Sequence, residues 1–128
     1  MKAVISSKRA APAAGAYSPA LLVDGWLFLS GQGGFDPATG ELAGDDIESQ
    51  VEQTLSNIDA LLEEAGLDRT DVVSCVAHLS DLSLFPRFNA AYAEGFAEPR
   101  PVRTTVEAKL VAGMLVELTV VARQGAGA

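Results

Sequence analysis

Residues 45–66, DDIESQVEQTLSNIDALLEEAG, decide the fold class of this chain. Apolar residues recur there at steps of three and four, a spacing that predicts one face of an amphipathic helix. Asp45 or Asp46 is suited to cap the start of this helix, and Gly66 is suited to end it. The apolar face comprises Ile47, Val51, Leu55, Ile58, Leu61, Leu62 and Ala65.

A second amphipathic helix is predicted after Ser83, which is suited to cap it, with Pro86 in the first turn. Its aromatic side comprises Phe85, Phe88, Tyr92 and Phe96. Apolar and β-branched runs predict six strands around the two helices. Their expected bounds are 3–6, 20–23, 26–30, 72–79, 102–107 and 115–122, with a two-residue hairpin turn at Asp24-Gly25.

The resulting order is β-β-β-α-β-α-β-β. Two helices with one apolar face each are expected to pack on one side of a single mixed sheet, which gives an α+β domain. One face of the last strand is wholly apolar and suits a position under the helices, whereas its other face is half-apolar and predicts contact with another subunit. The buried faces are expected to comprise Val116, Leu118, Val120 and Ala122 in the last strand, and Val73, Cys75, Ala77 and Leu79 in the strand over 72–79.

Composition limits the functions that the chain can perform. Hydrophobic residues make up 48% of the 128 residues, which suits one domain over 1–128, with 124–128 expected as a flexible tail. The formal net charge is −8 and the nine Lys and Arg residues are scattered, which argues against sequence-independent binding of nucleic acid. The single cysteine excludes an intrachain disulfide. No membrane span or secretory signal is recognised, so a cytoplasmic location is expected.

Arg103 is the residue whose position most needs a functional explanation. It lies inside a short β-branched strand, where burial of an unpaired guanidinium is costly. It must meet a carboxylate, reach water or bind an anionic ligand, and its planar fork of donors suits a carboxylate. If residues 108–114 connect a hairpin, Thr105 lies opposite Glu117 and Arg103 lies one diagonal step away, all on the face away from the helices.

Two interpretations of these residues remain open. One is a cross-strand ion pair between Arg103 and Glu117 with a purely structural role. The other is a site in which Arg103 binds a substrate carboxylate while Glu117 handles a water molecule or a proton.

Six segments carry a resemblance to one family: GAYS at 15–18, LSGQ at 29–32, DPATGE at 36–41, NAAY at 89–92, RTTVE at 103–107 and VEL at 116–118. In their order and spacing the chain resembles the RidA/YjgF/YER057c/UK114 family, also called the L-PSP endoribonuclease family, over residues 10–122. The resemblance implies a chorismate-mutase-like fold and a homotrimer with clefts between its subunits. It also implies hydrolysis of reactive 2-enamine and 2-imine acids, such as 2-aminoacrylate, to 2-oxo acids and ammonia, without a metal or cofactor.

The resemblance also assigns expected roles to particular residues. Arg103 matches the residue that holds the substrate carboxylate, and Glu117 matches the acidic residue that positions the attacking water. The mechanism that it implies needs orientation of the imine and one base to activate water, but no nucleophilic side chain. Further residues at matching positions are expected to line the cleft and bind substrate, and they are Tyr17, Ser30, Gly31, Asn89 and Thr105.

Three departures from the family pattern bear on the choice of substrate. Ala16 replaces the usual proline before Tyr17, Gly33-Gly34 replaces a common Ile-Pro, and Thr105 stands where many members carry cysteine. They leave room for a pathway-specific deaminase with a larger substrate. A non-catalytic ligand-binding or protective trimer is a further alternative, and an endoribonuclease or translation inhibitor is opposed by the net charge and the single histidine.

The remaining chemical residues have structural interpretations. Cys75 is expected to be a small buried hydrophobic residue, and His78 to be a histidine whose ring nitrogens are satisfied in a strand. No cluster of Cys, His and Asp has the spacing of metal ligands. Gly31-Gln32-Gly33-Gly34 lacks the third glycine and the following helix of a dinucleotide-binding motif.

Overall fold

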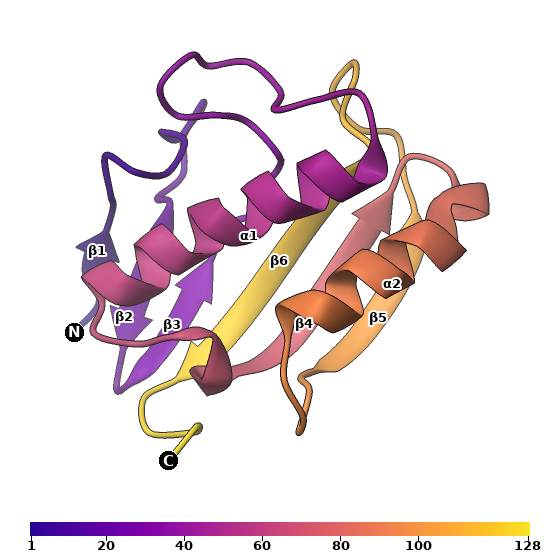
Figure 1. Cartoon of the computed structure of the whole chain (residues 1–128). Helices are drawn as coiled ribbons and strands as arrows, with labels where there is room; N and C mark the ends of the chain where they lie inside the picture. The colour runs from indigo at the N-terminus through magenta and orange to yellow at the C-terminus, as the bar shows by residue number, and fades with distance from the viewer.

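The computed structural model describes residues 1–128 and contains one six-stranded sheet with two helices on one of its faces (Figure 1). The strands are β1 (Ala3–Ile5), β2 (Ala20–Val23), β3 (Trp26–Leu29), β4 (Val72–Leu79), β5 (Val102–Glu107) and β6 (Val116–Arg123). The helices are α1 (Ile47–Glu64) and α2 (Phe85–Gly95), and single 3₁₀ turns cover Arg69–Asp71 and Leu82–Leu84. The predicted α+β class and element order are confirmed. Neither helix is long and apolar enough to cross a membrane.

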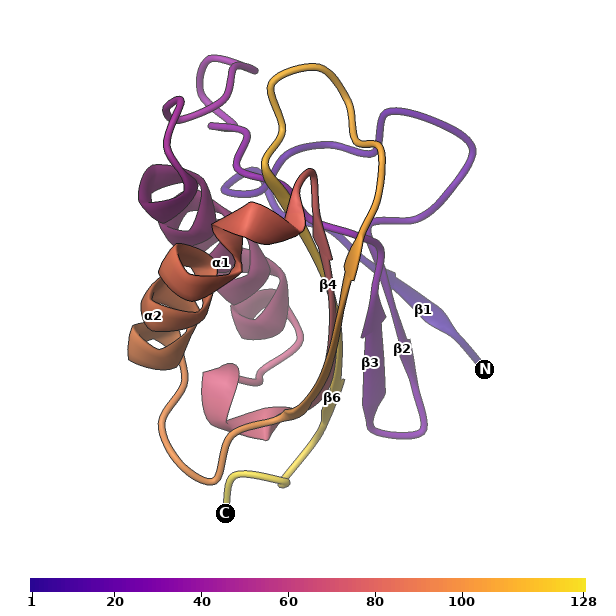
Figure 2. The same ribbon diagram turned by 90° about the vertical axis from the view of Figure 1, so that its right-hand side faces the viewer.

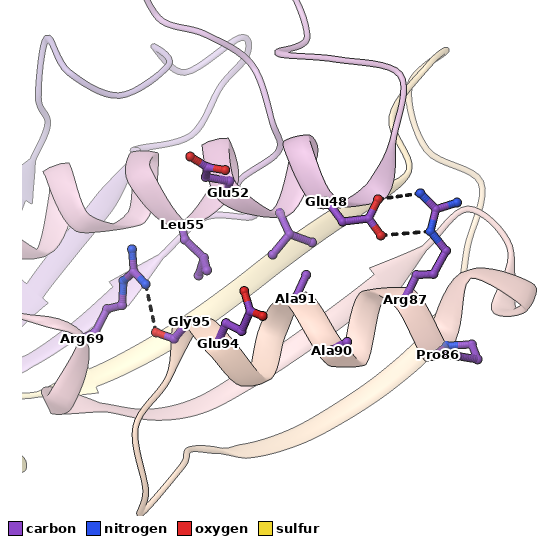
Figure 3. Close-up of a pocket in the computed structure, with 11 residues that line it drawn as sticks. Glu48, Glu52, Leu55, Arg69, Pro86, Arg87, Ala90, Ala91, Glu94 and Gly95 are labelled. Carbon is purple, nitrogen blue, oxygen red and sulfur yellow. Dashed lines mark hydrogen bonds and ion pairs between the residues drawn. The ribbon is translucent and has the colours of Figure 1, made fainter.

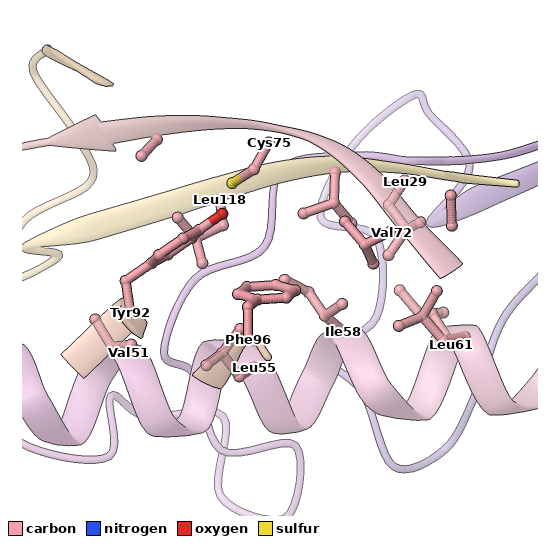
Figure 4. Packing of buried hydrophobic residues seen from close by; sticks show 14 of the residues in the cluster. Leu29, Val51, Leu55, Ile58, Leu61, Val72, Cys75, Tyr92, Phe96 and Leu118 are labelled. Atoms are coloured by element: carbon pink, nitrogen blue, oxygen red, sulfur yellow. The ribbon is translucent and has the colours of Figure 1, made fainter. Parts of the chain in front are cut away.

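Helix α1 forms as its sequence predicts. The Asp46 carboxylate accepts a hydrogen bond from the Ser49 backbone N–H at 2.9 Å, which caps the first turn. Gly66 follows the helix with a φ of +77°, a conformation that glycine adopts at low cost. The apolar face of α1 is buried against the sheet, and Figure 4 shows it packed with residues of α2, β4 and β6.

The strand order in the sheet is β1-β2-β3-β6-β4-β5. Strand β5 pairs in parallel with β4, because α2 carries the chain back across the sheet between them. Strand β6 pairs antiparallel with both β4 and β3, so β4 separates β5 from β6. The predicted hairpin across residues 108–114 is therefore wrong, since the chain passes over the end of β4 before it forms β6.

Two local predictions also need correction. The register of β4 against β6 shifts between Val72 and Ser74, so a β-bulge puts Val72 in the core and leaves Val73 half-buried. Ser83 does not cap α2; instead, its backbone N–H donates to the Asp81 side chain in the preceding 3₁₀ turn. Pro86 does occupy the first turn of α2, as predicted.

The helices cover only one of the two faces of the sheet. Figure 2 shows both helices on one side and no element on the other, which we call the open face. Strand pairing places Phe28 of β3 beside Val121 of β6 on this face, and Trp26 beside Arg123. Large apolar side chains are thus exposed over a continuous surface, which is unusual for a face that meets only water.

Two buried amides of α1 fasten the loops above the sheet. The Gln50 side chain donates to the Gly113 carbonyl at 3.0 Å and accepts from the Leu115 N–H at 2.8 Å. The Asn57 side chain donates to the carbonyls of Gly33 and Phe35 at 3.1 and 2.8 Å. Both side chains are fully buried, so the loops at 31–36 and 108–115 are fixed by hydrogen bonds that water does not weaken.

Replacement of Asn57 by alanine is expected to destabilise the fold, because two loop carbonyls lose their buried donor. We expect the free energy of unfolding to fall by about 2–4 kcal/mol, measured by urea denaturation. Ser56→Ala, an exposed position on the same helix, serves as the matched control and should stay within about 0.5 kcal/mol of the parent. Equal stability of the two variants would contradict this role for Asn57.

Candidate functional site

Arg103 extends from edge strand β5 toward α2, on the face that the helices cover. Its register partner on β4 is Cys75, which is buried beneath the helices. The Nη2 of Arg103 donates a hydrogen bond to Oδ1 of Asn89 on α2 at 2.9 Å. No carboxylate lies within ion-pair distance of Arg103, so its charge is not neutralised within the chain.

Three aromatic rings of α2, which we call the aromatic shelf, lie against the Arg103 guanidinium. The Cζ atom lies 4.6 Å from the ring centroid of Tyr92, and 5.4 and 5.5 Å from those of Phe88 and Phe85. These distances allow cation–π attraction. The shelf stabilises the position of the guanidinium without cancelling its charge, so the group remains available to an anion.

Glu117 lies on β6, on the open face. Its register partner on β4 is His78, with 3.8 Å between His78 Nδ1 and Glu117 Oε1. The carboxylate lies directly over Gly31, because a Cβ built on that glycine would be 2.6 Å from Glu117 Cδ. Paired backbone hydrogen bonds between Gln32 and Leu118, at 2.8 and 2.9 Å, hold the two segments together. A side chain at position 31 would therefore have to displace the Glu117 carboxylate.

A cavity of about 410 Å³ opens beside Glu117. Tyr17 and Gly31 contribute to its lining, and the Tyr17 hydroxyl accepts a hydrogen bond from the Ala14 N–H at 3.1 Å. Ser30 is not part of the lining, since its hydroxyl donates to the Ser18 carbonyl at 2.7 Å. That bond fixes the loop that carries Tyr17, so a local structural role for Ser30 agrees with the geometry.

Arg103 and Glu117 point to opposite faces of the sheet. Their register partners on β4, Cys75 and His78, are three residues apart, and successive side chains of a strand alternate between faces. Both the predicted ion pair and the predicted diagonal arrangement are therefore wrong within one chain, for the same reason that the hairpin is wrong.

The predicted site residues consequently form two groups. The first, which we call the α2 half-site, comprises Arg103, Asn89 and Thr105; Thr105 pairs with buried Ala77 and so shares the face of Arg103. The second, which we call the loop half-site, comprises Tyr17, Ser30, Gly31 and Glu117. The cavity beside Glu117 contains no member of the α2 half-site, and the hollow beside Arg103 and Asn89 contains no member of the loop half-site.

A groove of about 580 Å³ lies away from both half-sites, between α1 and α2 (Figure 3). Arg87 forms an ion pair with Glu48 across it. Arg69 pairs with Asp59 at 2.7 Å and donates to the Gly95 carbonyl at 2.9 Å. Its arginines are thus used to join the two helices, and we assign this groove a structural role.

The buried thiol and phenol near Arg103 are not acid–base groups at neutral pH. Burial raises the pKa of the Cys75 thiol to about 11. Burial also raises the pKa of the Tyr92 hydroxyl above its ordinary range. The expected structural role of Cys75 is consistent with this protonated, buried state.

Sequence reasoning missed one contact of the site. His78 was expected to be satisfied, but its Nδ1 is buried without a hydrogen-bond partner and faces Glu117. The signal was present in the strand pattern, since the antiparallel register of β4 and β6 puts the two residues side by side. The predicted hairpin paired β6 with β5 instead of β4, so the neighbouring positions of His78 and Glu117 were not predicted.

Comparison with known proteins places the chain among one group of relatives. The family model described as "Endoribonuclease L-PSP" matches residues 8–124. A RutC family protein of Pyrococcus horikoshii is 40% identical over 95% of this chain and 98% of its own. The human 2-iminobutanoate/2-iminopropanoate deaminase is 36% identical, over 98% and 92%. The structure of Escherichia coli TdcF with bound serine is 28% identical, with a TM-score of 0.89 over 96% of this chain and 99% of that one.

Replacement of Gly31 by alanine is expected to displace the Glu117 carboxylate while the fold persists, because the atoms that clash belong to the end of a flexible side chain. We expect a stability loss below about 1 kcal/mol and a rotated Glu117 in a crystal structure of the variant. Gly15→Ala, whose added Cβ would meet Tyr17 at an ordinary 3.4 Å, is the control and should leave Glu117 in place. An unmoved carboxylate in Gly31→Ala would contradict the close approach.

Proposed function

The chain belongs to the RidA/YjgF/UK114 family, whose family model is described as endoribonuclease L-PSP, and on that basis we propose that it hydrolyses 2-imino and 2-enamino acids to 2-oxo acids and ammonia. The observation that carries the proposal is Arg103, a guanidinium that has no carboxylate partner and is held in place by Asn89 and the aromatic shelf. The human and bovine relatives named 2-iminobutanoate/2-iminopropanoate deaminase support the same reaction class.

Arg103 binds the substrate carboxylate in this proposal. One of its terminal nitrogens already donates to Asn89, which fixes the plane of the guanidinium and leaves other N–H donors for two parallel bonds to a carboxylate. A substrate held in this way presents its imine carbon at a fixed distance from the anchor. Much of the barrier to a bimolecular reaction can be removed by such positioning.

Glu117 acts as the base that activates water. The water oxygen bonds to the imine carbon while Glu117 takes one water proton, and the π pair of the C=N bond moves to nitrogen. The proton then passes from Glu117 to that nitrogen. Glu117 then takes the proton of the new hydroxyl and delivers it to the amino nitrogen as the C–N bond breaks with its electron pair on nitrogen. Ammonia leaves and the carbonyl of the 2-oxo acid forms.

This chemistry requires a second copy of the chain, because the α2 half-site and the loop half-site lie on opposite faces of the sheet. We propose a homotrimer in which the α2 half-site of one subunit meets the loop half-site of its neighbour. Trp26, Phe28 and Val106 support such packing, since these large apolar side chains are exposed on the open face. Each cleft would then hold one anchor for the carboxylate and one base.

The family description also raises the possibility of RNA cleavage, and the charge of the chain opposes it. The formal net charge is −8, and four of the six arginines pair with the chain's own carboxylates: Arg9, Arg69, Arg87 and Arg100. A surface with so little free positive charge has weak attraction for a phosphate backbone. We therefore place imine hydrolysis first.

A pathway-specific deaminase with a larger substrate is the second candidate, and the cavity beside Glu117 favours it. Gly33 contributes no side chain there, and a Cβ at that position would lie 2.5 Å from the terminal methyl of Met114. Met114 thus fills the space above Gly33 with a flexible side chain that can repack around a ligand. Phe35 and Val111 add further apolar lining, which suits an aliphatic substrate side chain.

Two inactive variants are expected to restore activity when they are mixed, because each cleft takes Arg103 from one subunit and Glu117 from another. Arg103→Ala and Glu117→Gln should each lose at least about 100-fold in kcat/KM. Equal amounts, unfolded and refolded together, should recover about a quarter of the parent activity, since one cleft in four then holds both intact residues. The measurement is an oxidase-coupled assay with a semicarbazide trap for unreacted imine.

The control for this experiment is the double variant Arg103→Ala/Glu117→Gln refolded with the parent protein. If mixing the two single variants recovers nothing although trimers form, the cleft does not combine residues of two subunits. If the parent protein itself fails to protect any imine from the trap, the proposed reaction is wrong and a ligand-binding role takes its place.

Met114→Val is expected to favour bulkier substrates, because it shortens the side chain that fills the cavity. The ratio of kcat/KM for the leucine-derived imine to that for the alanine-derived imine should rise about 3- to 10-fold. Leu82→Ala, an exposed change outside the cavity, should leave the ratio unchanged. An unchanged ratio in Met114→Val, with the fold verified by thermal unfolding, would show that the substrate does not extend into this cavity.

A further inference from the structure

The single histidine of the chain lies beside the proposed base. His78 on β4 and Glu117 on β6 are register partners, and His78 Nδ1 is 3.8 Å from Glu117 Oε1. The distance exceeds a hydrogen bond by less than about 1 Å, which a small side-chain rotation can close. Both side chains are about one-third exposed on the open face, so they have room for that movement.

The polar atoms on both sides of this gap lack partners. His78 Nδ1 is buried and accepts or donates no hydrogen bond in the structure. Neither oxygen of Glu117 accepts a hydrogen bond, and the carboxylate lies directly over Gly31, which has no side chain to hold it. A buried nitrogen without a partner costs free energy, and the Glu117 carboxylate lies near enough to relieve that cost.

The surroundings of the ring give it no other charged neighbour. On β5 the register partner of His78 is Val106, and on its own strand the nearest residue of the same face is Val76. Glu117 is therefore the only titratable group among the side chains that flank His78 in the sheet. If a second subunit covers the open face, as the proposed trimer requires, loss of water will strengthen the attraction within the pair.

We propose that His78 is a positioning residue for Glu117, which donates its Nδ1–H to Glu117 Oε1 and so aims the other carboxylate oxygen at the attacking water. This inference rests on the proposed function for its catalytic consequence, but the contact itself does not. His78 touches neither the substrate nor the reacting atoms, and it takes up no proton in the reaction.

The proposed contact has a chemical use. A carboxylate above a bare glycine can rotate, and each wrong rotamer removes the base from the water that it must deprotonate. A hydrogen bond from a rigid ring on the neighbouring strand selects one rotamer. In other hydrolases a third group likewise orients the catalytic base, and loss of that group lowers turnover while the fold persists.

The tautomer of His78 provides a test that needs no turnover. Because the chain has one histidine, its ring gives a single set of ¹⁵N and ¹³C resonances. At about pH 9, where imidazoles are neutral, we expect the Nδ1–H tautomer to dominate in the parent protein. In Glu117→Ala the ring should revert to the Nε2–H form. An Nε2–H ring in the parent protein would overturn the proposal.

Two substitutions at His78 separate positioning from simple packing. His78→Leu removes the donor, and we expect kcat to fall about 10-fold with KM within twofold. His78→Asn places an amide N–H near the position of Nδ1 and should recover most of kcat. Loss in both variants to the same degree, or no loss in either, would contradict a donor at this position.

The outcomes also separate this inference from the proposed function. If the parent protein hydrolyses no imine but shows the Nδ1–H tautomer that depends on Glu117, the pair exists and the proposed reaction is wrong. If hydrolysis is present and His78→Leu matches the parent protein in kcat, the proposed reaction stands and the positioning role of His78 is wrong.

Discussion

The hydrogen bonds from Gln50 and Asn57 are the constraint on which the site depends. Both are polar residues on the buried face of an amphipathic helix, and each donates to carbonyls of the loops above the sheet. One anchors the loop before β6 and the other anchors the loop after β3. Gly31 lies in the loop after β3 and Glu117 follows the loop before β6, so α1 holds both segments that bring this backbone turn and this carboxylate together.

The place of β4 in the sheet determines where the site residues meet. Because α2 returns the chain in parallel beside β4, Arg103 lies on the same covered face as its register partner Cys75. Strand β6 pairs with the other edge of β4, so Glu117 lies on the same open face as its register partner His78. One strand thus separates an unpaired guanidinium from a carboxylate by the thickness of the sheet. In the proposed function, one substrate reaches both groups where two copies of the chain meet.

Local sequence patterns predicted most of the fold, whereas features that depend on pairing between distant segments were not predicted. The stripe from Ile47 to Ala65, the Asp24-Gly25 turn and the apolar face of β6 follow from short-range physics and are confirmed. The bulge at Val73 and the side-chain bonds of Gln50 depend on partners far along the chain. The position of β5 was predictable in principle, since a helix between two strands favours a parallel crossover rather than a hairpin.

The uneven pairing of the arginines bears on how an acidic chain could bind the anionic substrate proposed for it. A net charge of −8 repels carboxylates at long range, and salt screens that repulsion beyond about 8 Å. Attraction must therefore be local. Arg123 lies over the Trp26 ring and Arg103 lies on the aromatic shelf, and neither is paired with a carboxylate. Arg103 alone also has a side-chain amide that fixes its plane, so the proposed specificity for a planar carboxylate would arise from geometry rather than from the overall field.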